Sequence, residues 1–285
     1  AQLFTAYLSE RKRSGHLTPS AGPGRFLMPG DYEGSPMLTF FPWPGDGAGN
    51  TDQKNLLARR YESYKANAVR PFFEKHFSRI DRQIVLVDVL GALNQGPAAV
   101  IEMENALERA LTAFRPGRDS WLGRLFTHRI DSIMFATTKA DHLNQRNHPR
   151  LQKILAKVVA RARSRAIDAG ARIATTAIAA LRTTEDVERT STSNESPLPC
   201  VRGVPIEGQT LAGKPLDTTR PLIVFPGDLP EDPIEAFDAD IMHPGSLNFV
   251  RFRPRLQLGR RVNELEWPHA GLDRVIAFLL GDRLQ

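Results

Sequence analysis

The sequence predicts an α/β fold, built on a mainly parallel sheet that is flanked by helices. Three apolar runs with few charges indicate buried strands, at Gln83–Asp88, Ile130–Thr137 and Arg172–Ala179. Between them lie two segments in which apolar residues recur at helical spacing, Pro97–Phe114 and Pro149–Ala169. Strands that alternate with helices are typical of parallel sheets, because a parallel pair needs a long crossover connection.

The segments before this core differ in composition. Residues 1–50 are rich in Gly and Pro, which favour turns, and within them Met37–Phe41 is predicted to form a short strand. A helix is expected from Asp52 to about Lys75, because its apolar residues follow the helical period.

The pattern changes again after the third strand. Residues 183–199 are polar and loop-like, and residues 201–255 hold short apolar runs broken by Gly and Pro, which indicate antiparallel β structure. Ala270–Leu280 is an apolar helix that is expected to pack back on the sheet. We therefore divide the chain into an irregular N-terminal segment with a strand and a helix (1–82), an α/β core (83–199), a β-rich insertion (200–262) and a C-terminal helix (263–285).

Composition excludes several classes of protein. Of the 285 residues, 41% are hydrophobic and 25% charged, as in globular proteins rather than disordered ones. Apolar runs stay well short of the roughly 18 residues of a membrane span, and we see no secretory signal, so no transmembrane segment is expected. Because Cys200 is the single cysteine, an internal disulfide and a multi-cysteine zinc site are excluded, and a cytoplasmic location is favoured.

The charge balance is mildly basic. The chain has 38 basic and 32 acidic residues, a net charge of +6 that favours anionic ligands, nucleotides included. Local clusters occur at Arg161–Arg165 and Arg251–Arg255, and the other basic residues are scattered. This distribution argues against a dedicated nucleic-acid binding protein.

The first candidate site residues follow the first predicted core strand. Asp88 ends that strand and begins the pattern D-x-x-G, which Gly91 completes. In nucleoside-triphosphate hydrolases an Asp at this place holds Mg²⁺, and a glycine lets its backbone N–H approach the γ-phosphate. The alternative is an Asp that caps the next helix, and the short pattern alone does not decide between them.

A second motif follows the next strand. Thr138, Lys139, Ala140 and Asp141 form the arrangement [N/T]-K-x-D. The Asp141 carboxylate can accept hydrogen bonds from N1–H and the amino group of guanine, a donor pair that adenine lacks. The Lys139 stem can cover the face of the base, and Thr138 can brace the loop. The alternative is an ordinary polar turn between a strand and a helix.

Two weaker patterns complete the inventory. Ala179 and Ala180 follow the third strand, where small residues would let a backbone N–H meet guanine O6. Gly208–Pro215 has the spacing of a phosphate loop, G-x-x-x-x-G-K, but Pro215 replaces the Ser or Thr that would bind Mg²⁺. We therefore interpret Gly208–Pro215 as a β-turn.

The chain resembles the YcjX-like family of P-loop NTPases, which are bacterial stress-associated GTP-binding proteins. The resemblance runs over almost the whole chain and is strongest in Arg70–Pro97 and Leu125–His142, with further support from Pro23–Trp43 and Phe278–Leu284. It implies a P-loop NTPase-like sheet that lacks the first strand and the phosphate loop, since family members carry that loop upstream of the Pro23–Trp43 segment. We therefore expect an N-terminally truncated chain.

The resemblance also implies site roles. Asp88 and Gly91 would form the phosphate and Mg²⁺ switch, Thr138, Lys139 and Asp141 the base reader, and Ala179 and Ala180 the loop beside the base. The implied ligands are GTP or GDP with Mg²⁺, and the bound state would control a protein effector. Ala92 stands where many GTPases have a Gln that orients water, so hydrolysis is expected to be slow or to need a partner.

Three hypotheses therefore stay open from the sequence. The chain is the larger, C-terminal part of a GTPase and is inactive alone, or it is a non-catalytic nucleotide-binding or adaptor module, or it prefers ATP.

Overall fold

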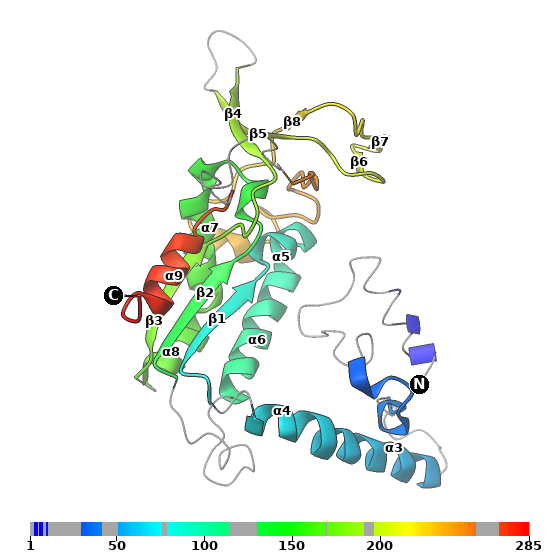
Figure 1. The fold of residues 1–285 in the computed structure, drawn as a ribbon. Coiled ribbons are helices and arrows are strands. Elements are labelled where there is room, and N and C mark those ends of the chain that lie inside the picture. The colour runs from blue at the N-terminus through cyan, green and yellow to red at the C-terminus, as the bar shows by residue number, and fades with distance from the viewer. Residues whose placement is uncertain are drawn as a thin grey trace, which may run out of the picture. The chain divides into compact units, whose positions relative to one another are not determined.

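In a computed structural model the chain forms two compact units, residues 1–80 with 112–128 and residues 81–111 with 129–285. The structure describes residues 30–41, 51–75, 79–113, 130–168, 170–190, 197–254 and 268–284, with a few positions among residues 3–10. Figure 1 shows the elements in both units. The four-part division predicted above stays a prediction.

The first unit is built around one long helical segment. It contains α3 (Thr51–Tyr64), a π-helical turn (Lys65–Val69) and α4 (Arg70–Lys75), which together match the predicted helix. The strand predicted at Met37–Phe41 is wrong, because Pro36–Leu38 form a 3-10 turn instead. Phe40 packs its ring against Tyr61 of α3, with centroids 5.2 Å apart, so this apolar run covers a helix rather than pairing with a strand.

The second unit contains a three-stranded parallel sheet in the order β1-β2-β3, namely β1 (Arg82–Val87), β2 (Ser132–Thr137) and β3 (Arg172–Ala177). Its register pairs Val87 with Thr137 and Thr137 with Ala177, so the three strands end at one edge. All six residues of β2 are buried, because helices cover both faces of this central strand. The predicted parallel sheet flanked by helices is confirmed.

The helices divide between the two faces of the sheet. Met134 and Ala136 of β2 form a cluster with Val275 and Leu279 of α9. The two helical connections, from β1 to β2 and from β2 to β3, lie on the other face. Connections between parallel strands are right-handed, and both connections step across the sheet in the same direction, so both lie on the same side of it. In agreement, α5 contacts α7; Figure 1 shows where both lie. The helices are α5 (Val89–Gln95), α6 (Pro97–Ala113), α7 (His148–Val158), α8 (Ala160–Asp168) and α9 (Leu272–Leu280).

Two details of these helices matter. The single helix predicted over Pro149–Ala169 is divided at Val159, whose N–H bonds to the carbonyl of Leu155 as the cap of α7. Within the described ranges, the helices fall short of the length and apolarity that crossing a membrane demands.

A second, antiparallel sheet has the order β4-β5-β8, namely β4 (Glu185–Arg189), β5 (Leu198–Gly203) and β8 (Leu222–Val224). The loop predicted over 183–199 is wrong for β4. Its residues, EDVER, form an edge strand on which polar side chains remain half-exposed or exposed.

The phosphate-loop look-alike is a hairpin, as predicted. β6 (Thr210–Leu211) pairs with β7 (Lys214–Pro215), and the two residues between them, Ala212 and Gly213, both have positive φ angles of 49° and 76°. Positive φ at both central positions defines the tight turn that joins antiparallel strands.

Acid is expected to loosen the attachment of β1 to the residues after α9. Arg82 donates to the carbonyl of Leu279 and to both carboxylate oxygens of Asp282, and this guanidinium lowers the pKa of Asp282 from 3.8 to about 2. Since the folded pKa is the lower one, the contribution to stability is present above the unfolded value and is lost as pH falls through about 2.

The measurement is the unfolding midpoint of the wild type and of Asp282→Asn as a function of pH. The difference between them should be constant above the ordinary pKa of 3.8 and should shrink between that value and about 2. A difference that does not change with pH would contradict the assignment.

Candidate functional site

The carboxyl ends of β1 and β2 bring the two sequence motifs together. Asp88 directly follows β1, and Thr138 directly follows β2, its neighbour in the sheet. The Thr138 N–H donates to the carbonyl of Val87 over 3.0 Å, which continues the pairing to the ends of the strands. This edge is where open α/β sheets bind ligands.

Asp88 caps the helix that it precedes. Its Oδ1 accepts the backbone N–H of Gly91, the third residue of α5, over 3.0 Å. A Cβ at Gly91 would lie 2.8 Å from Asp88 Oδ2, so this position needs glycine for the carboxylate to stay where it is. The helix-cap interpretation of D-x-x-G therefore holds in this structure, and the phosphate role of both residues remains a prediction.

Lys139 reaches across to the other motif. Its backbone is left-handed, with φ of 62°, and its Nζ lies 2.5 Å from Asp88 Oδ2. Both side chains are about half-exposed, so the pair contributes little to stability. Its geometric effect is larger: one Asp88 oxygen is held by Gly91 and the other by Lys139. Sequence reasoning missed this ion pair, because the motif places Lys139 over a base.

Asp141 is the buried carboxylate of the site, with 5% of its surface exposed. Its Oδ2 accepts two hydrogen bonds from Thr183, one from the backbone N–H over 2.9 Å and one from the hydroxyl over 2.7 Å. The Thr184 hydroxyl donates to the backbone carbonyl of Asp141. A carboxylate has about four lone-pair positions, so Oδ1 remains for further donors.

Thr183 and Thr184 are site residues that the sequence did not reveal. They lie in the stretch predicted as a loop, just before β4, and belong to no motif. One feature of the sequence could have indicated them. They are two hydroxyl residues shortly after β3, and β3 is the neighbour of β2, the strand that precedes Asp141.

The remaining predicted base-site residues lie at the end of β3. Ala179 is buried, and its N–H donates to the carbonyl of Ala270 over 2.9 Å, while the N–H of Ala270 returns the bond. Ala180 is exposed. In this conformation the Ala179 N–H is already used, and the base-facing role of both residues stays a prediction.

The loop that carries Asp141 is fixed from several sides. The Ala140 N–H donates to the carbonyl of Ile178 over 3.0 Å, and the Ala140 carbonyl lies 2.8 Å from His148 Nε2. Beside it, burial lowers the pKa of His142, whose ring meets Phe249 edge-on at 5.9 Å between centroids. These contacts hold the loop, and with it the Asp141 carboxylate, in one orientation.

Comparison with known proteins gives a family and two curated relatives. The family model of the YcjX-like family, DUF463, matches residues 1–284. A "Ras-like GTPase YcjX" of Shewanella oneidensis is 32% identical over 276 residues, which is 93% of this chain and 53% of that protein. A protein of the same name from Escherichia coli K12 is 33% identical over 296 residues, 100% of this chain and 59% of that protein.

The chain thus spans between half and three fifths of the length of these two curated relatives. The family match covers nearly every residue, and both relatives exceed 30% identity. This chain belongs to the YcjX-like family, DUF463.

Proposed function

We propose that this chain supplies the base-reading part of a guanine-nucleotide site, and that the protein containing it is a GTPase. One observation carries the proposal: at the carboxyl edge of adjacent parallel strands Asp88 pairs with Lys139, and Asp141 lies two residues beyond Lys139 in the same loop. The name "Ras-like GTPase" of two relatives gives independent support.

In this proposal Asp141 selects the base. Its carboxylate would accept N1–H and the amino group of guanine, and Thr183 would keep it oriented through the two bonds to Oδ2. Thr138 braces the loop, the Lys139 stem covers the base, and the backbone at Ala179 or Ala180 faces O6. For the Ala179 N–H to reach a ligand, its bond to Ala270 would have to open.

Asp88 and Gly91 would serve the phosphates and Mg²⁺. An Asp carboxylate is the ligand type that Mg²⁺ prefers, and Mg²⁺ commonly needs one or two such groups besides phosphate and water. Asp88 would supply a single carboxylate to such a site, since among the described residues no group of three or more acidic, His or Cys side chains is placed to hold a metal. When bound, Mg²⁺ neutralises charge on the phosphates.

For Asp88 to bind Mg²⁺ or a phosphate-bound water, its ion pair with Lys139 has to open. The Lys139 ammonium occupies Oδ2 at 2.5 Å, so it must leave before Asp88 meets a cation or a phosphate-bound water. Release of Lys139 would also free its stem for the base. The two motifs would therefore change partners together when nucleotide binds.

A phosphate-binding loop would come from outside residues 1–285. The only G-x-x-x-x-G-K spacing belongs to the β6–β7 hairpin. Within the described sheet β1 pairs on one side alone, with β2. Leu86 is 60% and Ile84 36% exposed, on the same face of the sheet on which α9 covers β2. A further strand and helix beside β1 would bury these side chains.

The experiment compares GTP hydrolysis by residues 1–285 with that of a full-length relative. We expect little or no turnover by this chain, because the groups around the β- and γ-phosphates are incomplete and Ala92 cannot orient water. Equal rates for both would contradict the missing-loop proposal. A full-length relative that binds neither GTP nor GDP would contradict the GTPase proposal itself.

The second candidate is a non-catalytic nucleotide-binding or adaptor module. The engagement of both Asp88 oxygens, by Gly91 and Lys139, favours it. Titration of a full-length relative with GDP, GTP and ATP separates two of the cases, because an adaptor binds none and a module with ATP preference binds ATP best. A non-catalytic nucleotide-binding module would bind nucleotide but show no turnover in the comparison above. The further roles that we propose, a stress-associated cytoplasmic switch that acts on a protein effector, depend on the GTPase being confirmed.

A further inference from the structure

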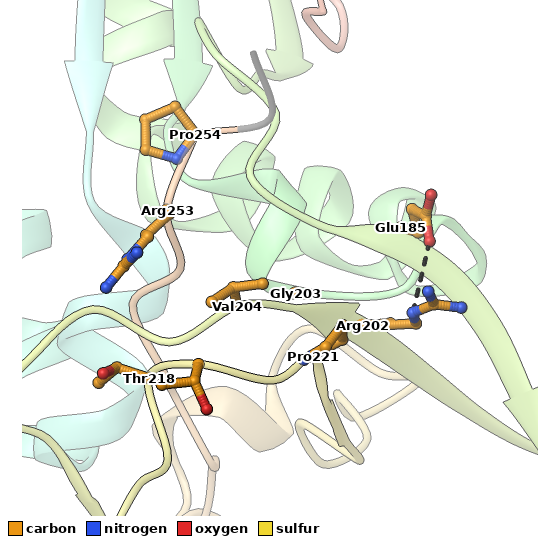
Figure 2. A pocket seen from close by; sticks show the side chains of 9 residues that line it. Glu185, Arg202, Gly203, Val204, Thr218, Pro221, Arg253 and Pro254 are labelled. Atoms are coloured by element: carbon orange, nitrogen blue, oxygen red, sulfur yellow. Dashed lines mark ion pairs between the residues drawn. The ribbon is translucent and has the colours of Figure 1, made fainter. Parts of the chain in front are cut away.

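A basic cavity lies in the antiparallel region, built by residues other than those of the candidate nucleotide site. It has a volume of about 570 Å³ and lies between the ends of β4 and β5, the segment leading into β8 and residues 253–254. Figure 2 shows Arg202 and Arg253 on opposite sides of its lining, with Gly203 and Val204 between them and Thr218 on the side of Arg253.

The two arginines differ in their partners. Arg202 has a weak ion pair with Glu185, with Nε and Oε2 3.8 Å apart, and remains about half-exposed (Figure 2). The Arg253 guanidinium is exposed, and within the described part of the chain no ion pair or hydrogen bond uses it. The lining thus contains two exposed arginines and one carboxylate, that of Glu185, so it carries an excess of positive charge.

Paired backbone holds both arginines in place. Arg202 lies in β5 and pairs with Glu185 of β4 and Ile223 of β8. The Arg253 N–H donates to the carbonyl of Val204 over 2.8 Å. Beneath them the Phe252 ring fills the space beside Gly203, where a Cβ would lie 2.7 Å from the ring. The backbone that carries both arginines is therefore ordered before a ligand binds, which lowers the conformational entropy lost on binding.

The lining indicates the kind of ligand. Two guanidinium groups at separate sides suit carboxylates spaced along an extended chain better than one phosphate held between them. No aromatic side chain lines the cavity, so a stacking platform for bases is lacking among the lining residues. Proline, glycine and valine surfaces with the Thr218 hydroxyl suit a peptide backbone between the two charges.

We propose that this cavity, the Arg202–Arg253 pocket, binds an acidic segment of a partner protein. Its chemistry is recognition of Asp or Glu side chains by arginine, and it gives Arg253, one member of the basic cluster at Arg251–Arg255, a role other than nucleic-acid binding. The proposal does not depend on the nucleotide site, because none of its lining residues belongs to that site.

The test measures binding of a fluorescent oligoglutamate peptide to residues 1–285 by anisotropy at low ionic strength. Arg253→Ala and Arg202→Ala should each weaken binding by roughly tenfold or more, since each loses a charge-assisted contact. Arg163→Ala is the matched control: it removes the same charge from an exposed position on α8, away from the pocket, and should change affinity little. Arg253→Lys should retain part of the affinity.

Three results would overturn the proposal. Equal losses for Arg163→Ala and Arg253→Ala would show attraction by net charge alone. Equal binding of an oligoglutamine peptide of the same length would exclude carboxylate recognition. Inorganic pyrophosphate, or a single-stranded RNA, that binds more tightly than the peptide and loses affinity in both pocket variants would assign the pocket to a different ligand.

Discussion

Asp141→Asn is expected to lower the affinity for GDP by on the order of 100-fold or more, while affinity for xanthosine diphosphate rises. The carboxylate accepts two donors, but an amide offers one acceptor and one donor, so its NH₂ faces the guanine donors. Xanthine carries a carbonyl where guanine has its amino group, and this carbonyl can accept from the new NH₂. The measurement is calorimetric titration of both nucleotides into a form of the protein that binds GDP.

Thr183→Val is the matched control for this prediction. It removes the hydroxyl bond to Asp141 Oδ2 but keeps the backbone N–H bond of 2.9 Å, so the carboxylate loses one of two supports. We expect a several-fold loss of GDP affinity with guanine preference retained. If Asp141→Asn leaves base preference unchanged, Asp141 is not the base reader and its bonds to Thr183 are structural only.

Gly271→Ala is expected to destabilise the second unit by about 3 kcal/mol or more. Gly271 precedes α9 with a φ of 72°, a left-handed conformation that costs alanine about 1 kcal/mol. A Cβ there would also lie 2.4 Å from the carbonyl oxygen of Ala177. Ala177 is the last residue of β3 and is held by its pairing with β2, so α9 rather than the strand must move.

Gly208→Ala separates the two costs. Gly208 has a φ of 79°, close to that of Gly271, but its Cβ would meet no atom within 4 Å. Its loss of stability should therefore be about 1 kcal/mol, from the backbone conformation alone. Urea unfolding followed by circular dichroism gives both values. Equal destabilisation by the two variants would show that α9 moves away from β3 without cost.

The sequence predicted β2 well because burial on both faces leaves a strong mark. The run SIMFAT of β2 contains no charged residue, and all six of its residues are buried. The same expectation was wrong for β1, which pairs on one side in the described sheet and leaves Leu86 60% exposed. Edge strands lack this mark: β4 reads EDVER, because its side chains are only partly buried or exposed and backbone pairing to β5 holds it. The run MLTFF misled in the opposite way: it is apolar but forms no strand. Its residue Phe40 packs against Tyr61 of α3 instead.

The place of the two motifs could be predicted from the sequence, whereas the roles of their residues stay predictions. Asp88 and Asp141 were expected at one sheet edge because adjacent parallel strands end together, and the structure has them there. The pairing of Lys139 with Asp88 depends on a left-handed backbone at a non-glycine residue, which composition does not reveal. Thr183 supports Asp141 from 42 residues away, so no local spacing indicates it.

The position of α9 has a consequence for the order in which the molecule is made. The helix that covers Met134 and Ala136 follows the whole antiparallel sheet in the chain. During synthesis, β2 therefore leaves the ribosome long before α9 does. Until α9 is made, the apolar face of the sheet that it covers stays exposed to solvent. The parallel sheet can complete its packing only late. A nascent chain stalled before Leu272 would expose apolar surface to chaperones and to other copies of the chain.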